Sequence, residues 1–151
     1  MAKLKNFFLL LALSLFFSSC GYTPLFSKKD VNFSIENIEF LGDKNVKKNI
    51  DYALSGYKNK PDKEKKISLV ITNLKNTTIG SKNSKGEAET YRIGIDANVK
   101  IIVDENNFIE KNFTKTSIYT VVESKSEEKL IENLSNEIAL QIIFEILKIT
   151  K

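Results

Sequence analysis

The sequence predicts an α+β fold, a two-layer sandwich in which two helices cover one face of a four-stranded mixed sheet in the order β-α-β-β-β-α. Residues 91–103 carry apolar side chains at every odd position, and the even positions up to Lys100 are polar or glycine, as expected for a strand with one buried face. Residues 44–55 and 125–148 instead carry apolar side chains at spacings of three and four, which is typical of amphipathic helices. Because each element has one apolar face, the helices and the sheet are expected to pack together.

The first strand is expected at 31–40, where apolar and polar residues alternate and a change of phase near Asn37 predicts a bulge. Gly42 and Asp43 interrupt this pattern, and Asp43 is a good N-cap for a helix over 44–55. Gly56 is expected to be its C-cap. A helix between two strands predicts that these strands run parallel.

The lysine-rich stretch 58–66 contains Pro61 and has two interpretations. It is either a site for a polyanion or lipid phosphate or, as we favour, a solvated loop. A second strand is expected from Ile67 to about Leu74. Residues 76–89, rich in Gly, Ser, Thr and Asn, are expected to form a long polar loop.

The strand over 91–103 is expected to expose a polar face formed by Arg92, Gly94, Asp96, Asn98 and Lys100. Residues 104–107 have the composition of a hairpin turn. The strand that follows, 108–121, is polar enough for an edge position.

The last helix has a capping-box spacing between Ser124 and Glu127, and no Gly or Pro interrupts residues 125–148. One apolar stripe is expected to face the sheet: Leu130, Leu134, Ile138, Ile142 and Ile146. At about 1.5 Å per residue this helix is long enough to cover most of the strand over 91–103.

The N-terminus has the pattern of an export signal, with Lys3 and Lys5 before the 11-residue apolar run Phe7–Phe17. This run is shorter than the roughly 20 residues that span a bilayer. Ser18, Ser19 and Cys20 follow and resemble a lipobox, although Phe17 stands where Leu is usual. We therefore expect a signal peptide at 1–19, a lipidated tether at 20–30 and a domain at 31–151. The alternative is an ordinary secretory signal with an incidental cysteine.

The composition argues against several classes of function. There is no histidine, and Cys20 is the single cysteine, so the usual general base, the commonest metal ligand and a disulfide are excluded. We expect neither an enzyme nor a cofactor or metal site. The 23 basic and 19 acidic residues give a net charge of +4, and removal of Lys3 and Lys5 leaves +2. This weak excess does not indicate a nucleic-acid partner.

The segment Cys20–Phe26, which reads Cys-Gly-Tyr-Thr-Pro-Leu-Phe, resembles the start of the mature LPS-assembly lipoproteins of the LptE family. The resemblance continues at Glu89–Ile93 and in the long helix after Ser124. It implies diacylglycerol and N-acyl chains on Cys20, including palmitate. It also implies a place on the periplasmic face of the outer membrane, a large β-barrel partner of the LptD kind that the protein plugs, and delivery of lipopolysaccharide to the outer leaflet.

Lipopolysaccharide carries phosphates, so cations are the candidate contacts for it or for the barrel: Arg92, Lys100, Lys58, Lys60, Lys82 and Lys85. Two alternatives stay open. One is a scaffold lipoprotein of another envelope machine, and the other is a periplasm-facing lipid carrier with a cavity between its helices and its sheet.

Overall fold

The computed structural model describes residues 31–104, 106–120 and 126–150. The description below concerns the unit Val31–Lys151. The expected signal peptide, Cys20 and the tether lie outside the described residues.

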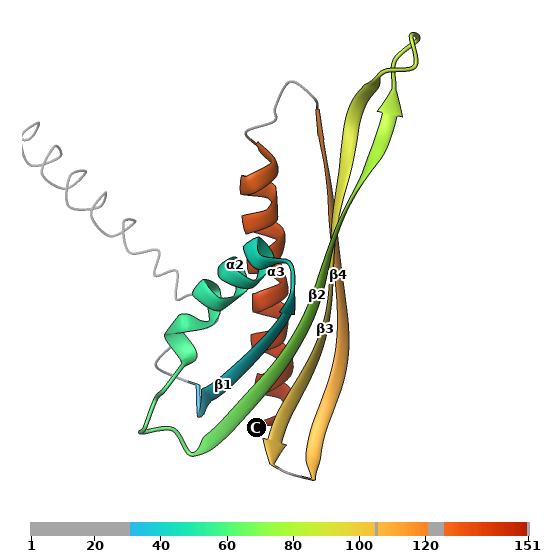
Figure 1. Cartoon of the computed structure of the whole chain (residues 1–151). Helices are drawn as coiled ribbons and strands as arrows, with labels where there is room; N and C mark the ends of the chain where they lie inside the picture. Colours follow the sequence, from blue (N-terminus) through green and yellow to red (C-terminus); the bar gives the residue numbers. More distant parts are fainter. Residues whose placement is uncertain (1–30, 105, 121–125, 151) are drawn as a thin grey trace, which may run out of the picture. The chain divides into compact units, whose positions relative to one another are not determined.

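The described unit has the predicted element order and fold class (Figure 1). Strand β1 (Phe33–Gly42) leads through α2 (Lys44–Leu54) and a 3₁₀ turn (Ser55–Tyr57) to β2 (Lys65–Lys82). Strands β3 (Ala88–Asp104) and β4 (Asn107–Thr120) and helix α3 (Ser126–Ile149) follow. The sheet order is β1-β2-β3-β4, with β1 parallel to β2 and the other pairs antiparallel. The prediction that the helices lie on one face of a mixed sheet is confirmed.

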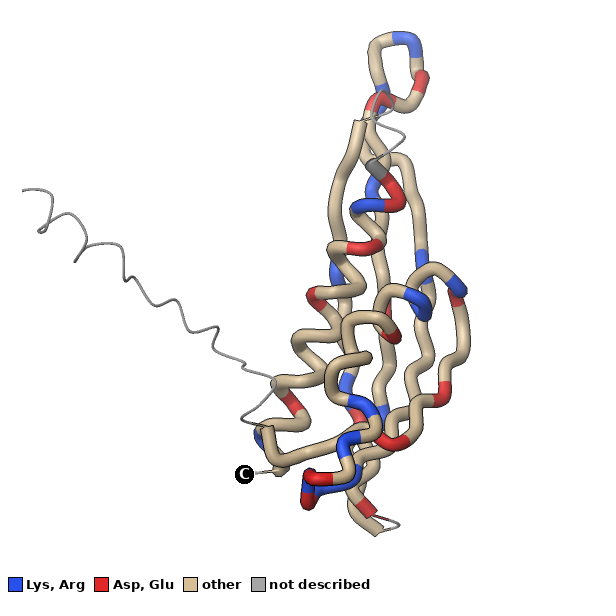
Figure 2. The backbone as a smooth tube through the Cα atoms, turned by 90° about the vertical axis from the view of Figure 1, so that its left-hand side faces the viewer, with Lys and Arg blue, Asp and Glu red and all other residues tan. Residues whose placement is uncertain are grey.

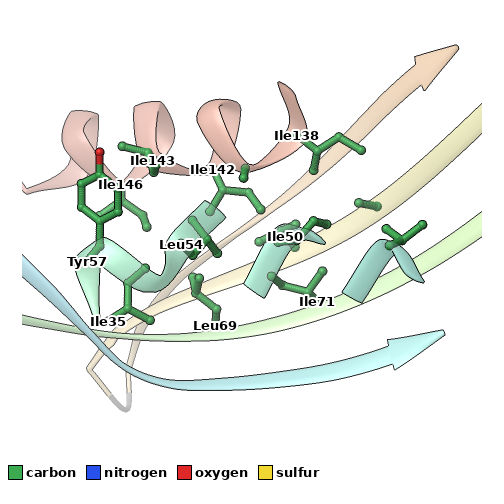
Figure 3. Close-up of a cluster of buried hydrophobic side chains, with 14 of the residues drawn as sticks. Ile35, Ile50, Leu54, Tyr57, Leu69, Ile71, Ile138, Ile142, Ile143 and Ile146 are labelled. Atoms are coloured by element: carbon green, nitrogen blue, oxygen red, sulfur yellow. The ribbon is translucent and has the colours of Figure 1, made fainter. Parts of the chain in front are cut away.

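The core lies between the sheet and the two helices (Figure 3). Ile35, Leu69 and Ile71 point from the strands toward Ile50 of α2 and Ile142 of α3. All five side chains are essentially inaccessible to solvent. Full burial of such a side chain contributes about 1.5–3 kcal/mol, so this layer is the main source of stability. The predicted stripe of α3 is confirmed, although Leu130 at its start is only partly buried.

The turn between β1 and α2 confirms two predictions and corrects a third. The register of β1 shifts between Ile35 and Asn37, which is the expected bulge. The Asp43 carboxylate caps α2 by accepting hydrogen bonds from the N–H groups of Asn45 (2.9 Å) and Val46 (3.1 Å). Gly56 is not the C-cap, because α2 continues into a right-handed 3₁₀ turn. This turn buries Tyr57 and stacks its ring on Phe33, with ring centroids 5.6 Å apart.

Strand β2 is much longer than predicted. It begins at Lys65, inside the expected 58–66 loop, and runs to Lys82 rather than Leu74. The expected loop at 76–89 is therefore wrong, since β2 and β3 stay paired as far as Lys82 and Ala88. Backbone pairing and the β-branched residues 77–79 outweigh the polar composition here. A Cβ on Gly80 would lie 2.6 Å from the Thr90 hydroxyl oxygen, so glycine permits the close approach.

The last three elements agree with the prediction except at their ends. Strand β4 is an edge strand, as expected. Two of its lysines point toward the helix layer, where Lys111 and Lys115 pair with Glu145 and Glu137 of α3. The expected cap Ser124 and the residues Val121 and Lys125 lie outside the described part of the chain, as does Glu105 in the β3–β4 turn.

Candidate functional site

The most distinctive surface is a β-hairpin arm, residues 76–92, formed by the distal halves of β2 and β3 and their turn (Figure 1). Every side chain from 76 to 87 is exposed, so both faces of the arm meet solvent along β2. Asn83 shapes the turn, since its Oδ1 accepts hydrogen bonds from the N–H groups of Lys85 (2.9 Å) and Glu87 (3.1 Å). Gly86 adopts a positive φ of 83°, which glycine tolerates without strain. The arm is thus an ordered hairpin.

Packing at the root of the arm joins it to α3. Glu127 accepts a hydrogen bond from the Tyr119 hydroxyl at 3.1 Å and pairs with the Lys75 ammonium at 3.5 Å. The Tyr119 ring stacks on Tyr91 with centroids 5.7 Å apart. Burial, followed by the hydrogen bond to Glu127, raises the pKa of Tyr119 above its usual value. These contacts hold the arm at its base while its tip projects beyond the helix layer.

Three of the predicted cations belong to this arm: Lys82, Lys85 and Arg92. All three are exposed, and none forms an ion pair with any acid in the described part of the chain. The nearby acids have neutral partners instead. Glu87 accepts a hydrogen bond from the Asn83 amide at 2.9 Å, and Glu89 accepts one from the Ser81 hydroxyl at 3.5 Å. In Figure 2 the tip of the arm accordingly carries both blue and red segments. The three cations remain available to an anionic ligand.

Lys100 is separated from this group. It shares the outer face of β3 with Arg92, but eight residues along a strand correspond to about 26 Å. Its ammonium lies 3.9 Å from the centroid of the Phe108 ring, a cation–π contact on the outer face. The structure therefore does not bring Lys100 and Arg92 to one site.

Lys58 and Lys60 lie in the segment that leads from α2 into β2, where β1 and β2 begin. Lys58 pairs with Asp51 of α2 at 2.5 Å. The backbone N–H of Lys60 donates a hydrogen bond to the buried Ser34 hydroxyl at 2.7 Å. This end of the sheet is opposite the β2–β3 turn, so the six predicted cations form at least two separate groups.

The outer face of the sheet is polar between these groups. Asn98 donates to Asn112 at 2.8 Å, and the Thr114 hydroxyl donates to Asp96 at 2.6 Å. These side chains line a shallow depression of about 320 Å³ across β2, β3 and β4. Because these polar groups bond to one another, the depression offers few free donors, and the exposed Leu74 side chain gives it apolar surface as well.

The polar face also carries exposed apolar side chains that the sequence analysis did not single out. Leu74 is 59% exposed and lies opposite Asp96, and Ile118 is 56% exposed and lies opposite Arg92. Both alternate in the sequence with buried residues of β2 and β4, and this alternation could have predicted that they lie on the outer face. Ile118 places an apolar surface directly beside the guanidinium-bearing residue of the arm.

The described residues contain no helix that is long and apolar enough to cross a bilayer. Among the same residues, no group of three or more His, Cys, Asp or Glu side chains could hold a metal ion.

Neither a protein-family model nor a curated protein matches the sequence. Solved structures do match. The crystal structure of the rare lipoprotein B from Shewanella oneidensis has a TM-score of 0.55 at 10% identity, covering 74% of this chain and 93% of that chain. This chain has the fold of that lipoprotein. The minor lipoprotein from Acinetobacter baumannii gives a TM-score of 0.52 at 14% identity, with 75% and 91% of the two chains covered.

An uncharacterized lipoprotein B from Nitrosomonas europaea, solved by NMR, gives a TM-score of 0.51 at 14% identity and covers 80% of this chain and 88% of that chain. The three matches cover most of each lipoprotein structure, so this chain contains nearly all of the elements of the fold that those structures have. At these identities the likeness establishes the fold alone.

Proposed function

We propose that this chain is a lipid-anchored outer-membrane lipoprotein that assembles with a large β-barrel translocon, plugs its lumen and binds lipopolysaccharide through the hairpin arm. The observation that carries the proposal is the arm itself. It is an ordered hairpin with exposed side chains along β2 and three cations, Lys82, Lys85 and Arg92, without acidic partners among the described residues.

The anchor in this proposal is Cys20. The apolar run before it has the length of a signal peptide, and the small residues Ser18 and Ser19 suit cleavage directly before the cysteine. Two or more acyl chains, each stabilised by about 0.8 kcal/mol per buried CH₂, hold a protein on a bilayer. The fold shared with three lipoprotein structures supports this part of the proposal.

The proposed place inside a barrel rests on the polarity of the arm and of the outer sheet face. Large outer-membrane barrels have polar, water-filled interiors. A plug must therefore present polar surface on several sides, because exposing a large apolar face to the water in the lumen costs free energy. The network of Asn98, Asn112, Asp96 and Thr114 meets this requirement, since its groups are already hydrogen-bonded to one another.

The proposed ligand follows from the charges of the arm and from the apolar surface beside them. Arg92 can bind a phosphate in two-pronged geometry, and Lys82 and Lys85 can supply further charge-assisted hydrogen bonds. Ile118, in register with Arg92, offers an apolar contact next to this cation. Phosphate beside a hydrocarbon region is the chemistry of lipopolysaccharide. In this proposal the chain acts by binding and positioning and catalyses no reaction.

The packing of the core gives the lipid-carrier alternative no support. A carrier needs an apolar cavity between helices and sheet, and in this chain the side chains of that layer are buried against one another (Figure 3). The scaffold alternative differs from our proposal in its partner, so the partner is what must be identified.

The test is purification of the tagged, full-length protein from native outer membranes in mild detergent. We expect a large β-barrel in stoichiometric amount, together with lipopolysaccharide. Recovery alone, or with a different envelope complex, would contradict the plug and leave the fold unaffected. A matched pair of variants sharpens the assignment of the ligand. Neutralising Lys82, Lys85 and Arg92 should reduce the recovered lipopolysaccharide, whereas neutralising Lys44, Lys60 and Lys65 should not.

A further inference from the structure

The charges of the described domain are distributed unevenly along the chain. Residues 44–66, which we call the basic segment, comprise α2 and the stretch leading into β2. They contain eight lysines and three acids, a net charge of +5. The other described residues contain nine basic and thirteen acidic side chains, a net charge of −4. The basic charge of the domain is therefore concentrated in this segment, although the described residues together carry a net charge of only +1.

Several lysines of the basic segment have no acidic partner among the described residues: Lys44, Lys48, Lys60 and Lys65. The ammonium of a fifth, Lys47, lies 5.6 Å from the centroid of the Phe40 ring. Tyr52 is 80% exposed on α2 and lines a surface groove of about 790 Å³, whose other charged residues are Lys44, Lys47, Lys48, Asp51 and Glu132. Exposed tyrosine beside lysines is typical of surfaces that lie at the level of lipid headgroups.

The chain enters the described domain next to this segment. The carbonyl of Asn32 accepts a hydrogen bond from the N–H of Lys65 at 3.3 Å, and the Asn32 amide donates to the Glu64 carboxylate at 3.0 Å. Phe33 is paired with Lys65 in the parallel β1–β2 ladder. The tether thus joins the domain beside the lysines that precede β2, at the end of the sheet where β1 and β2 begin, whereas the start of α2 lies near the middle of β2.

The tether limits how far this end can move from a membrane. Eleven peptide units separate Cys20 from Val31, so a fully extended tether spans at most about 40 Å. Anchoring at Cys20 would therefore keep the basic segment at a high effective concentration beside the headgroups.

We infer that the basic segment binds the anionic phospholipid surface of the leaflet that holds the anchor, with α2 and the lysines before β2 against the headgroups. The partner is a bilayer surface bearing phosphate diesters. This inference uses the proposed anchor at Cys20. It concerns the lipoprotein before a partner binds and is independent of lipopolysaccharide and of the barrel.

The attraction between the lysines and an anionic bilayer is strong enough to orient the domain. Each lysine near an anionic bilayer strengthens the association about fivefold, and the effect disappears within a Debye length, about 8 Å at physiological ionic strength. Four such lysines on an already tethered domain are enough to favour one orientation strongly. The contact should therefore depend on anionic lipid and be lost at high salt.

The experiment uses the membrane form made from the complete precursor, reconstituted in vesicles of phosphatidylcholine alone or with about one-third phosphatidylglycerol. A membrane-impermeant amine-acylating reagent labels the lysines, and mass spectrometry reads each site. On anionic vesicles we expect labelling of Lys44, Lys48, Lys60 and Lys65 to fall about threefold or more. Labelling should recover in about 1 M salt, where the Debye length is about 3 Å. Labelling of Lys82 and Lys85 should not change.

Two variants provide the matched comparison, because each removes three positive charges. In the Lys44→Gln/Lys48→Gln/Lys60→Gln variant, the protection of Lys65 should be lost. In the Lys82→Gln/Lys85→Gln/Lys129→Gln variant, Lys65 should stay protected. Equal labelling of the basic segment on both kinds of vesicle would overturn the inference. Protection of Lys82 and Lys85 on anionic vesicles to the same extent as the basic segment would also overturn it. The mass of the N-terminal peptide reports acylation of Cys20 separately, so a failure of the anchor is distinguished from a failure of the basic segment.

Discussion

Asn73 of β2 accepts, through its side-chain Oδ1, a hydrogen bond from the backbone N–H of Asp43 at 3.0 Å. Its Nδ2 donates to the carbonyl oxygen of Leu41 at 3.2 Å, so one buried amide bridges the turn between β1 and α2. Gly42, between them, has a φ of 115°, and a Cβ there would lie 1.9 Å from the Asn73 carbonyl oxygen. Asp43 in turn caps α2. The start of the basic helix is thereby fixed to the centre of the sheet.

We predict that Asn73→Ala lowers the free energy of unfolding by about 1–3 kcal/mol, because it leaves the Asp43 N–H and the Leu41 carbonyl without their partner in a partly buried site. Urea unfolding measures the change. Asn76→Ala is the matched control, since Asn76 is exposed on the same strand and its one side-chain bond, to Asp96, is 3.5 Å long. Equal losses in the two variants would contradict the bridging role.

The ion pairs of Glu145 predict a pH dependence of stability. The hydrogen bond from Lys148 (2.6 Å), with the charge of Lys111 adding to it, holds the pKa of Glu145 below the usual 4.5. A carboxyl whose pKa is lower in the folded state stabilises the fold above pH 4.5 and loses this contribution as the pH falls through the folded-state pKa. The stability difference between the wild type and Glu145→Gln should therefore be largest near neutral pH and shrink below 4.5.

Urea unfolding at a series of pH values measures this difference. Lys148→Met serves as the control, since it removes the main cause of the shift and should remove most of the same pH dependence. A difference between the wild type and Glu145→Gln that stays constant down to acid pH would show that the pair does not hold the carboxylate ionised.

Charge reversal in the arm should weaken binding of lipopolysaccharide with little effect on stability. Arg92 is exposed and has no acidic partner in the described part of the chain, so Arg92→Glu disturbs no packed contact. A lost charge-assisted hydrogen bond corresponds to about tenfold in affinity or more. Lys60→Glu, at the other end of the sheet, should leave the affinity unchanged. Titration with lipopolysaccharide in detergent measures both variants, and equal affinities would remove Arg92 from the site.

Cys20→Ala should detach the protein from membranes and leave the domain folded, because the acyl chains are the proposed anchor and the core lies within 31–150. Fractionation of washed membranes measures attachment, and circular dichroism of the soluble fraction measures folding. Ser19→Ala is a suitable control, since it keeps a small residue before the cysteine. Retention of Cys20→Ala in washed membranes as a lone protein would contradict the anchor.

The elements with a clear hydrophobic period could be predicted from the sequence. The alternation over 91–103 and the apolar stripe of α3 each identify one buried face, and burial is what decides those elements. The bulge at Asn37 and the cap at Asp43 are local features and were equally accessible. The C-cap was not, because Gly56 is helical in response to the packing of Tyr57 on Phe33, a contact across the fold.

The arm was missed because neither of its faces is buried along β2, so residues 76–82 show no alternation. Its strands are held by backbone pairing, which leaves no trace in composition. One signal was present: a strand predicted to span 91–103 needs a partner of similar length, and a second strand that ends at Leu74 is too short. This longer hairpin is also why the candidate cations Lys82, Lys85 and Arg92 of the arm lie far from Lys58 and Lys60 at the other end of the sheet.

The central claim is that the arm lies inside a barrel and contacts lipopolysaccharide. A photo-crosslinking amino acid at Ser84, in the turn of the arm, tests it in native membranes, with the same amino acid at Tyr52 of α2 as the reference position. The account predicts that position 84 cross-links to a large β-barrel protein and to lipopolysaccharide, and that position 52 does not cross-link to lipopolysaccharide. Cross-links from position 84 to phospholipid alone, or to no envelope component, would contradict it.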